Sequence, residues 1–302
     1  MSFDLLIAFD KAEYLNPQLY MMIDTLKDNI PEETILHVVT NRDKHDKIIN
    51  YILDTFPDGK SIIYHNDGNK TNHLKSRCKY MFNCFDIQTD KEWVIKLEAD
   101  LIVLKHLDIF NEILKSEYDL VIEPENRKIH SDIIATKLWR LIYNHLDIKQ
   151  PKDKIVFRED NEEGLPLYGT GLVCVKSKHL KTINNRWVPL TKICENWIGF
   201  NIHPNEFAFT AMAYDEGWNT YLYPPKYKFN PIGHFRKGDY PSIELIDDCK
   251  LPDETIVFDY HRPQWLMHVA KYNPEIHNII KRNKKYIPNE WWELTNMEFQ
   301  EK

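Results

Sequence analysis

The first hundred residues alternate short apolar runs with segments of helical periodicity. Residues 3–9 (FDLLIAF) form an apolar run of strand length, and the next such run is TILHVVT at residues 34–40. Between them, apolar residues recur at helical spacing over residues 19–26. Strands that alternate with helices predict βαβ units with right-handed crossovers, and hence an α/β fold with a largely parallel sheet. The pattern continues with a helix at 47–56, a strand at 61–64, a helix at 74–85 and a strand at 93–97.

The order of elements is looser beyond residue 100. A polar, proline-bearing stretch over residues 149–166 predicts a surface loop, and Gly217 is placed to end a helix in the C-cap manner. We find no internal repeat and no linker, and therefore expect one domain over residues 1–302. The predicted strands are 118–123, 167–176 and 255–260, and the predicted helices are 133–146 and 205–216.

Composition and charge exclude several functional classes. The net charge of −7 argues against nucleic-acid binding, which normally leaves a basic footprint. The longest apolar runs are strand-length, far short of the about 20 residues that a membrane helix needs. The opening MSFDLLIAFD has no basic leader, and the five cysteines are scattered without a CxxC pair. We therefore expect a cytoplasmic protein with reduced thiols and no transmembrane segment.

Two carboxylates directly follow the predicted strand at 93–97. Glu98 and Asp100 are spaced i and i+2, so on an extended segment they point to the same side. Ligands of parallel sheets bind beyond the carboxyl ends of the strands, where this pair falls. Buried anions are costly without a cation, and a hard divalent ion such as Mg²⁺ or Mn²⁺ removes that cost while sharing phosphate oxygens. The alternative is a strand end whose acids face solvent.

Basic and aromatic side chains follow other predicted strands. His261 comes after the strand at 255–260, where its imidazole would complete a metal shell, and His234 competes for that role. Arg262 beside it would neutralise phosphate charge. Asp10 and Tyr14 follow the first strand, and a carboxylate near a ribose with an aromatic over a base suits a nucleotide. For each histidine and for Tyr14, a purely structural role remains open.

Taken in order, the motifs resemble those of GT-A-fold glycosyltransferases, in the layout of glycosyltransferase family 8 with its glycogenin-like and galactosyltransferase-like enzymes. Each motif is degenerate, but the order is maintained from about residue 3 to residue 270. The segments that carry the resemblance are LIAFDKAEY (6–14), VIKLEADLIV (94–103), YGTGL (168–172), Asn205-Glu206, Trp218, YKFN (227–230) and HRPQW (261–265).

The resemblance implies a fold and an activity. The fold would be a Rossmann-like mixed sheet flanked by helices, with a nucleotide-binding half at about 1–104, an acceptor half at about 105–270 and a helical tail at 271–302. The activity would be transfer of a sugar from a nucleotide-diphosphate donor, with a UDP-sugar favoured, to a hydroxyl of a glycan or other acceptor.

The resemblance also implies residue roles. The divalent metal, Mn²⁺ or Mg²⁺, would bind Glu98, Asp100 and His261, and Asn205 and Glu206 would lie near the anomeric carbon as catalytic residues. Aromatic residues from Trp218 to Tyr227 would stack on a sugar. Glu98 and Asp100 would also contact the donor. The other donor-binding residues would be Ala8, Asp10, Tyr14, Arg77 and Arg262.

The sequence departs from the family pattern at four places. Glu98 and Asn205 stand where Asp is usual, Gly169 stands where Asn is usual, and the element at 261–265 lacks a glycine. Two other functions stay open. A sugar-phosphate nucleotidyltransferase of this fold would need a glycine-rich loop after the first strand, and residues 9–17 contain no glycine. A catalytically inert carbohydrate-binding protein of the same fold would tolerate the departures.

Overall fold

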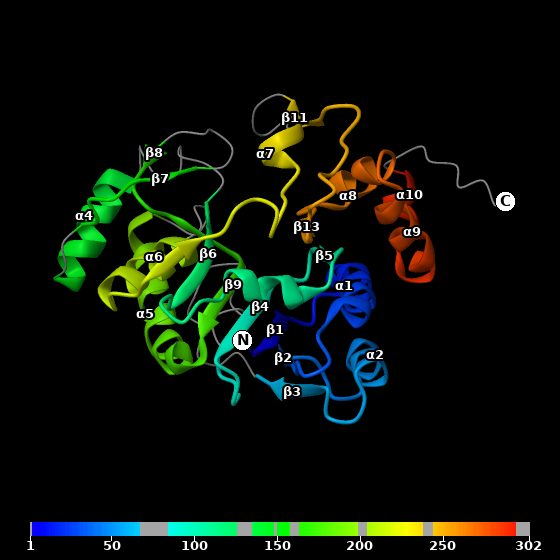
Figure 1. The fold of residues 1–302 in the computed structure, drawn as a ribbon, viewed down its shortest axis with the longest axis horizontal. Helices are drawn as coiled ribbons and strands as arrows, with labels where there is room; N and C mark the ends of the chain where they lie inside the picture. The colour runs from blue at the N-terminus through cyan, green and yellow to red at the C-terminus, as the bar shows by residue number, and fades with distance from the viewer. Residues whose placement is uncertain are drawn as a thin grey trace.

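The structure is a computed structural model, and it describes residues 2–66, 84–125, 135–147, 150–157, 163–198, 204–237 and 244–293. Seven strands form one central sheet in the order β10-β6-β9-β4-β1-β2-β3 (Figure 1). The sheet spans both predicted halves of the chain. Its strands are β1 Phe3–Phe9, β2 Leu36–Thr40, β3 Ser61–His65, β4 Trp93–Leu97, β6 Leu120–Pro124, β9 Tyr168–Lys176 and β10 Thr220–Leu222.

Parallel pairing in the first part of the sheet follows the predicted βαβ units. β1 pairs in parallel with β2 and with β4, and β2 pairs in parallel with β3. Helix α1 (Asn16–Asn29) connects β1 to β2, and α2 (Lys47–Thr55) connects β2 to β3. The long strand β9 runs antiparallel between β4 and β6, so the sheet is mixed. These pairings confirm the predicted α/β class.

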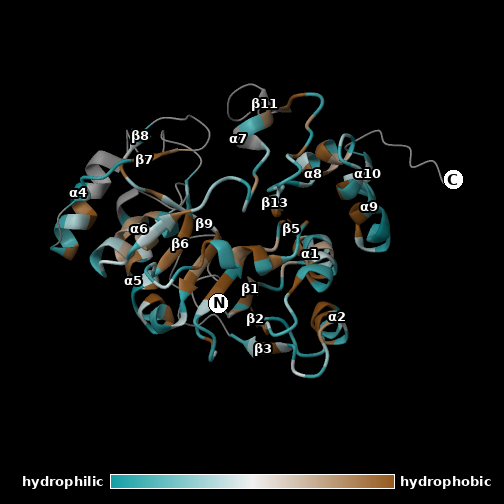
Figure 2. Ribbon diagram, in the orientation of Figure 1, coloured by the Kyte–Doolittle hydropathy of each residue, from teal (hydrophilic) through white to brown (hydrophobic). Residues whose placement is uncertain are grey.

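Alternate residues of β1 pack into two different cores. Leu6 and Ala8 belong to one buried cluster, which includes residues of α5 and α6, whereas Leu5 and Ile7 belong to another that includes residues of α1 and α2. Because both faces of the strand are covered, FDLLIAF is apolar at every position except Asp4 and does not alternate. Figures 1 and 2 show the apolar strands lying between these helix pairs.

The remaining helices surround the sheet and form a C-terminal extension. Gly217 follows α6 with a φ of +67°, a conformation that suits glycine, as the sequence predicted. The predicted helix at 74–85 lies almost entirely outside the described residues. The helices are α4 Ala135–Leu146, α5 Leu180–Ile198, α6 Pro204–Asp215, α7 Ile232–Phe235, α8 Pro263–Ala270, α9 Pro274–Arg282 and α10 Asn289–Glu293, with short 3-10 turns η1 Glu13–Leu15, η4 Leu107–Glu112, η5 Ser177–His179 and η6 Lys284–Tyr286.

A separate two-stranded sheet joins distant parts of the chain. β5 (Leu101–Val103) pairs antiparallel with β13 (Val257–Asp259), and the register places Asp259 opposite Leu101. Ile102 and Phe258 extend a third buried cluster formed largely by α8 and α9. The strand predicted at 255–260 is thus shorter than expected and lies outside the main sheet. Two further two-stranded sheets pair β7 Ile155–Val156 with β8 Glu163–Gly164 and β11 Arg236–Lys237 with β12 Glu244–Leu245.

The described cysteines, Cys84, Cys174, Cys194 and Cys249, are buried and have free thiols. Among the described helices, none combines the length and the apolar character that crossing a membrane would require.

Candidate active site

Two loops leave the same edge of the sheet. β1 and β4 are parallel neighbours with Ile7 opposite Leu97, so the residues after Phe9 and after Leu97 emerge side by side. Residues 10–12, which we call the β1 loop, lead into η1, and residues 98–100 lead into β5. The pairing of β13 with β5 then brings residues 259–261 to Asp100. Three segments far apart in sequence therefore meet at the carboxyl ends of the parallel strands.

Asp100, Asp259 and His261 form a group that would hold a metal ion. One ligand atom from each of them lies within 4.8 Å of the other two. Nδ1 of His261 is 3.9 Å from Oδ2 of Asp100 and 3.8 Å from Oδ1 of Asp259. Oδ1 of Asp259 is buried and has no hydrogen-bond partner among the described residues. Because an unpartnered buried carboxylate oxygen is costly, this donor set fits a divalent cation.

His261 adopts a rare backbone conformation. Its φ is +57°, and the N–H of Arg262 donates to the carbonyl of Tyr260 at 2.5 Å, so His261 is the central residue of a three-residue turn. The imidazole stacks against Trp265 with ring centroids 6.0 Å apart. A non-glycine residue with positive φ costs about 1–2 kcal/mol. Such local strain is typical of residues that a site needs in a particular place.

The other oxygen of Asp259 is held by a buried ammonium. Nζ of Lys228 lies 2.7 Å from Oδ2 of Asp259 and 2.6 Å from Oε1 of Glu123, and all three side chains are at most 5% exposed. The amide of Asn230 donates to the same Oδ2 at 3.4 Å. Lys228 is thus compensated by two carboxylates, which a buried charge requires.

Two glycines of β9 make room for this ion pair. A Cβ on Gly171 would lie 2.6 Å from Nζ of Lys228, and a Cβ on Gly169 would lie 2.9 Å from Cγ of Glu123. The YGTGL motif therefore has a packing reason for both of its glycines.

Glu98 lies beside the three-residue group and has a different partner. Its Oε1 is 3.2 Å from Nζ of Lys96, which also donates to the carbonyl of Thr170 at 2.6 Å. The structure therefore brings together Asp100 and His261 of the predicted metal ligands, and it adds Asp259, which the sequence analysis did not single out. The signal for Asp259 was its position two residues before His261 at the end of a strand.

The charges of the site shift several pKa values. Burial raises the pKa of Asp100 to about 7, together with the neighbouring charges of Asp259 and Glu98. Desolvation acts to lower the pKa of His261, but the Asp259 carboxylate outweighs it and raises that pKa to about 9. Burial would raise the pKa of Asp259, but Lys228 and His261 hold it below its usual range. The neighbouring charges therefore favour the ionised form of Asp259 and the protonated form of His261, whereas burial favours the neutral form of Asp100.

Asn205 and Glu206 lie in the first turn of α6, and both are buried. Nδ2 of Asn205 donates to Oγ1 of Thr170 at 3.3 Å, so the helix start is attached to β9 between its two glycines. Burial raises the pKa of Glu206 well above its usual value, with further contributions from Glu125, to which it is hydrogen-bonded. The protonated form of a carboxyl is a hydrogen-bond donor as well as an acceptor.

The predicted nucleotide contacts fall in different environments. Ala8 is buried in the sheet, and Oδ1 of Asp10 accepts a hydrogen bond from the N–H of Ala12 at 2.8 Å. Tyr14 on η1 is 72% exposed. The guanidinium of Arg262 lies 4.8 Å from the centre of the Trp265 ring. Arg77 lies outside the described residues.

Other candidates of the sequence analysis lie elsewhere. His234 is on α7, stacks on Phe229 at 4.5 Å, and is not part of the three-residue group. Trp218, Tyr223 and Tyr227 are at most 8% exposed and pack in the hydrophobic clusters. These three rings therefore lie inside the core, whereas Tyr221, the other aromatic residue of the segment from Trp218 to Tyr227, is half-buried and stacks on Tyr118.

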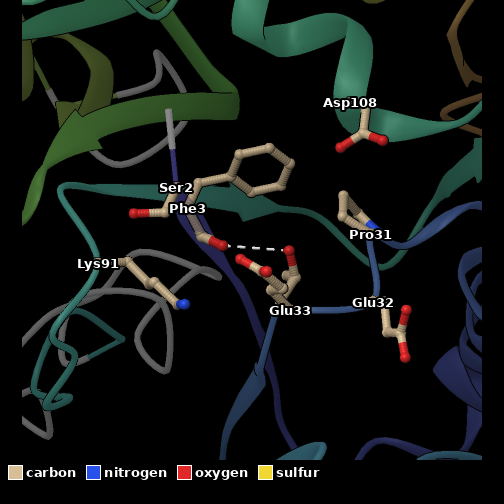
Figure 3. A pocket seen from close by; sticks show the side chains of 8 residues that line it. Ser2, Phe3, Pro31, Glu32, Glu33, Lys91 and Asp108 are labelled. Atoms are coloured by element: carbon tan, nitrogen blue, oxygen red, sulfur yellow. Dashed lines mark hydrogen bonds between the residues drawn. The ribbon is translucent and has the colours of Figure 1, made fainter.

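A surface pocket of about 490 Å³ lies at the opposite edge of the sheet (Figure 3). It is formed at the amino ends of β1 and β2, away from the carboxyl ends that carry Asp10 and Asp100. It is therefore separate from the candidate active site. Its lining residues are Ser2, Phe3, Pro31, Glu32, Glu33, Thr34, Lys91 and Asp108.

Comparison with solved structures identifies the fold. No protein-family model and no curated protein matches the sequence. A structure of LgtC with an active-site mutation aligns over 96% of this chain and 99% of its own, with a TM-score of 0.58 and 11% identity. The chain has the GT-A glycosyltransferase fold. A structure of the galactosyltransferase LgtC in complex with donor and acceptor sugar analogues has a TM-score of 0.54 at 12% identity, over 96% of this chain and 99% of its own. Mouse xyloside xylosyltransferase 1 gives 0.54 at 13% identity, over 86% of this chain and 97% of its own. The GT-A expectation from the motif order is confirmed.

Proposed function

We propose that the protein is a metal-dependent glycosyltransferase that moves a sugar from a nucleotide-diphosphate donor, with UDP-sugars favoured, to a hydroxyl of a glycan or other acceptor. One observation carries the proposal: Asp100, Asp259 and His261 converge at the carboxyl edge of a GT-A sheet, next to the β1 loop. Ligands of open α/β sheets bind at this edge. The complex of LgtC with donor and acceptor sugar analogues supports sugar substrates for this fold.

Asp100, Asp259 and His261 would hold a Mn²⁺ or Mg²⁺ ion. A bound divalent ion would supply the positive charge that stabilises a departing nucleoside diphosphate. Glu98, which the sequence analysis placed among the ligands, is assigned to the wall of the site because Lys96 holds its carboxylate. Lys228 and Asn230 orient Asp259 so that one oxygen faces the cation position, as is usual around metal-binding carboxylates.

Donor contacts are assigned along the β1 loop and at the start of α8. The exposed ring of Tyr14 would stack on the base, and Asp10 would contact the ribose. Arg262 follows His261 directly and would neutralise phosphate charge, and Arg77 is proposed for the same purpose from the sequence.

Asn205 and Glu206 are assigned to the sugar side of the site. Burial, together with the hydrogen-bonded neighbour Glu125, raises the pKa of Glu206 well above its usual value and so favours its neutral form. A neutral carboxyl both donates and accepts hydrogen bonds, so it would orient a sugar hydroxyl near the anomeric carbon without adding charge there. The amide of Asn205, which reaches Thr170, would fix the start of α6 against β9.

The test is hydrolysis of a panel of nucleotide sugars by the purified protein, with and without Mn²⁺. We expect Mn²⁺-dependent release of the nucleoside diphosphate from at least one UDP-sugar. Asp100→Ala should abolish this release while the far-UV circular dichroism spectrum stays unchanged, and Asp108→Ala on the surface is the matched control. Unchanged turnover by Asp100→Ala contradicts the proposed site.

The same protein preparation separates the two alternatives. Formation of a nucleotide sugar from a sugar phosphate and a nucleoside triphosphate, with release of pyrophosphate, would identify a nucleotidyltransferase. Calorimetric titration with several nucleoside diphosphates that shows no Mn²⁺-linked binding of any of them would identify an inert protein of the same fold.

A further inference from the structure

Arg42 is a buried cation that the proposed function leaves without a role. It lies two residues beyond the end of β2 and is only 4% exposed, although arginine is seldom buried unless it is paired. Its N–H donates to Oγ1 of Thr40 at 3.2 Å, and its carbonyl lies 3.1 Å from Nδ1 of His65. The backbone of Arg42 is therefore attached to the ends of β2 and β3.

The guanidinium of Arg42 donates hydrogen bonds to the backbone of the β1 loop. Its Nε donates to the carbonyl of Asp10 at 2.8 Å, and its Nη2 donates to the carbonyl of Ala12 at 3.0 Å. Its Nη1 reaches Asp46, with a closest distance of 3.3 Å, and its Cζ lies 5.5 Å from the centre of the Phe9 ring. A planar guanidinium donates to several acceptors at fixed spacing, which the single ammonium of lysine does not do.

The contact at Ala12 connects Arg42 to Tyr14. The carbonyl of Ala12 also accepts from the N–H of Leu15 at 3.2 Å, which closes the single turn of η1. Ala12 is the residue that precedes this turn, and Tyr14 lies at its centre with 72% of its surface exposed. The guanidinium thus holds the backbone from which the exposed ring projects.

We infer that Arg42 is a positioning residue, which holds the β1 loop so that Tyr14 and Asp10 are ready to receive a nucleoside. The inference rests on the proposed function, since it assumes that this loop binds a nucleotide. Two carbonyls fixed before the ligand arrives reduce the ordering cost of binding, which is how preorganised loops gain affinity. Because Arg42 acts on the base and ribose side, its effect is separate from that of the cation site.

The experiment compares two probes, UDP and inorganic pyrophosphate, by calorimetric titration in the presence of Mn²⁺. We expect Arg42→Lys to weaken UDP binding about tenfold, the scale of losing one aromatic–base stack, and to leave pyrophosphate binding within about twofold. Tyr14→Ala should give the same pattern. The double variant should bind UDP no more weakly than whichever single variant binds it less tightly. The reason is that both changes act on the same contact, the Tyr14 ring held by the β1 loop.

The control is Arg186→Lys, since Arg186 also forms two charge-assisted contacts, to Asp215 and Glu216, but at the far end of α6. We expect this variant to bind UDP as the wild type does. Should Arg42→Lys not fold, Arg42→Gln serves the same comparison. The inference is overturned if Arg42→Lys binds UDP normally, if it weakens pyrophosphate as much as UDP, or if the losses of the two single variants add. A wild-type protein that binds no UDP overturns the proposed function itself, and the inference with it.

Discussion

Lys228 places its ammonium 2.7 Å from Oδ2 of Asp259, inside the protein and directly behind the candidate cation position. Glu123 completes the arrangement at 2.6 Å from the same Nζ. Desolvation acts to lower the pKa of Lys228, but Asp259 and Glu123 raise it well above its usual value. The buried lysine therefore stays charged, and Asp259 keeps a fixed orientation.

Replacing Lys228 by Met should destabilise the protein strongly. The change leaves Glu123 and Asp259 buried without their cation, which costs about 3–5 kcal/mol. Urea denaturation followed by circular dichroism measures the free energy of unfolding. Lys226→Met is the matched control, because Lys226 pairs with Glu112 at the surface, and we expect a loss below about 1 kcal/mol. Equal losses for the two variants would contradict the buried ion pair.

Gly171→Ala should destabilise through the same ammonium. The new Cβ would lie 2.6 Å from Nζ of Lys228 and 3.1 Å from Oε2 of Glu98, and the lysine is pinned by two carboxylates. We expect a loss of about 1–3 kcal/mol in urea denaturation. In the Lys228→Met background the same change should cost less, because Nζ is absent. Strictly additive losses would show that the contact is not the cause.

His261→Gly and His261→Ala should differ in stability but not in cation binding. Both remove the imidazole, whereas only glycine relieves the φ of +57°. The glycine variant should therefore be more stable than the alanine variant by about 1–2 kcal/mol in urea denaturation. We expect Mn²⁺ to raise the melting temperature of the wild type and of neither variant. Identical stabilities would argue against strain at this residue.

The stability of the protein should fall in acid partly through Asp119. Burial would raise the pKa of Asp119, but hydrogen bonds from His179 and Lys178 outweigh it and hold that pKa below its usual range. The Asp119 carboxylate therefore contributes fully to stability above the pKa of about 4 that it has in the unfolded chain. This contribution disappears as the pH falls through the lower pKa of the folded protein.

Asp119→Asn should accordingly lower the free energy of unfolding by about 1–2 kcal/mol at pH 7. Its difference from the wild type should narrow below about pH 4. Urea denaturation at pH 7, 5 and 3 measures it. Asp108→Asn provides the control, since Asp108 pairs with His106 at the surface, 3.1 Å away. A difference in unfolding free energy between Asp119→Asn and the wild type that widens in acid would contradict the lowered pKa of Asp119.

The fold class, and the edge of the sheet that carries the candidate site, were predictable from local patterns. The alternation of FDLLIAF and TILHVVT with segments of helical periodicity predicted parallel strands, and β1 and β2 do pair in parallel. Glu98 and Asp100, which follow WVIKL, then lie at the carboxyl ends of the parallel strands, where ligands of such sheets bind. α5 was not predicted, since Pro189 lies inside it and a proline normally argues against a helix interior.

The partners within the site were less predictable. Asp259 belongs to the group only because it pairs opposite Leu101, and no local pattern specifies a register between residues so distant in sequence. Lys228 in YKFN has the pattern of a surface charge, and its burial depends on Glu123 of β6. Long-range pairing of this kind is decided by tertiary packing rather than by periodicity.

The pairing of β5 with β13 has a consequence for how the protein is made. A nascent chain carries Asp100 about 160 residues before it carries Asp259 and His261, so the three candidate ligands meet only after synthesis has passed His261. Closing so long a loop is entropically unfavourable and slow to nucleate. A cation that binds only after Asp100, Asp259 and His261 have come together would therefore stabilise this late-formed contact. It would shift the folding equilibrium toward the native state by mass action.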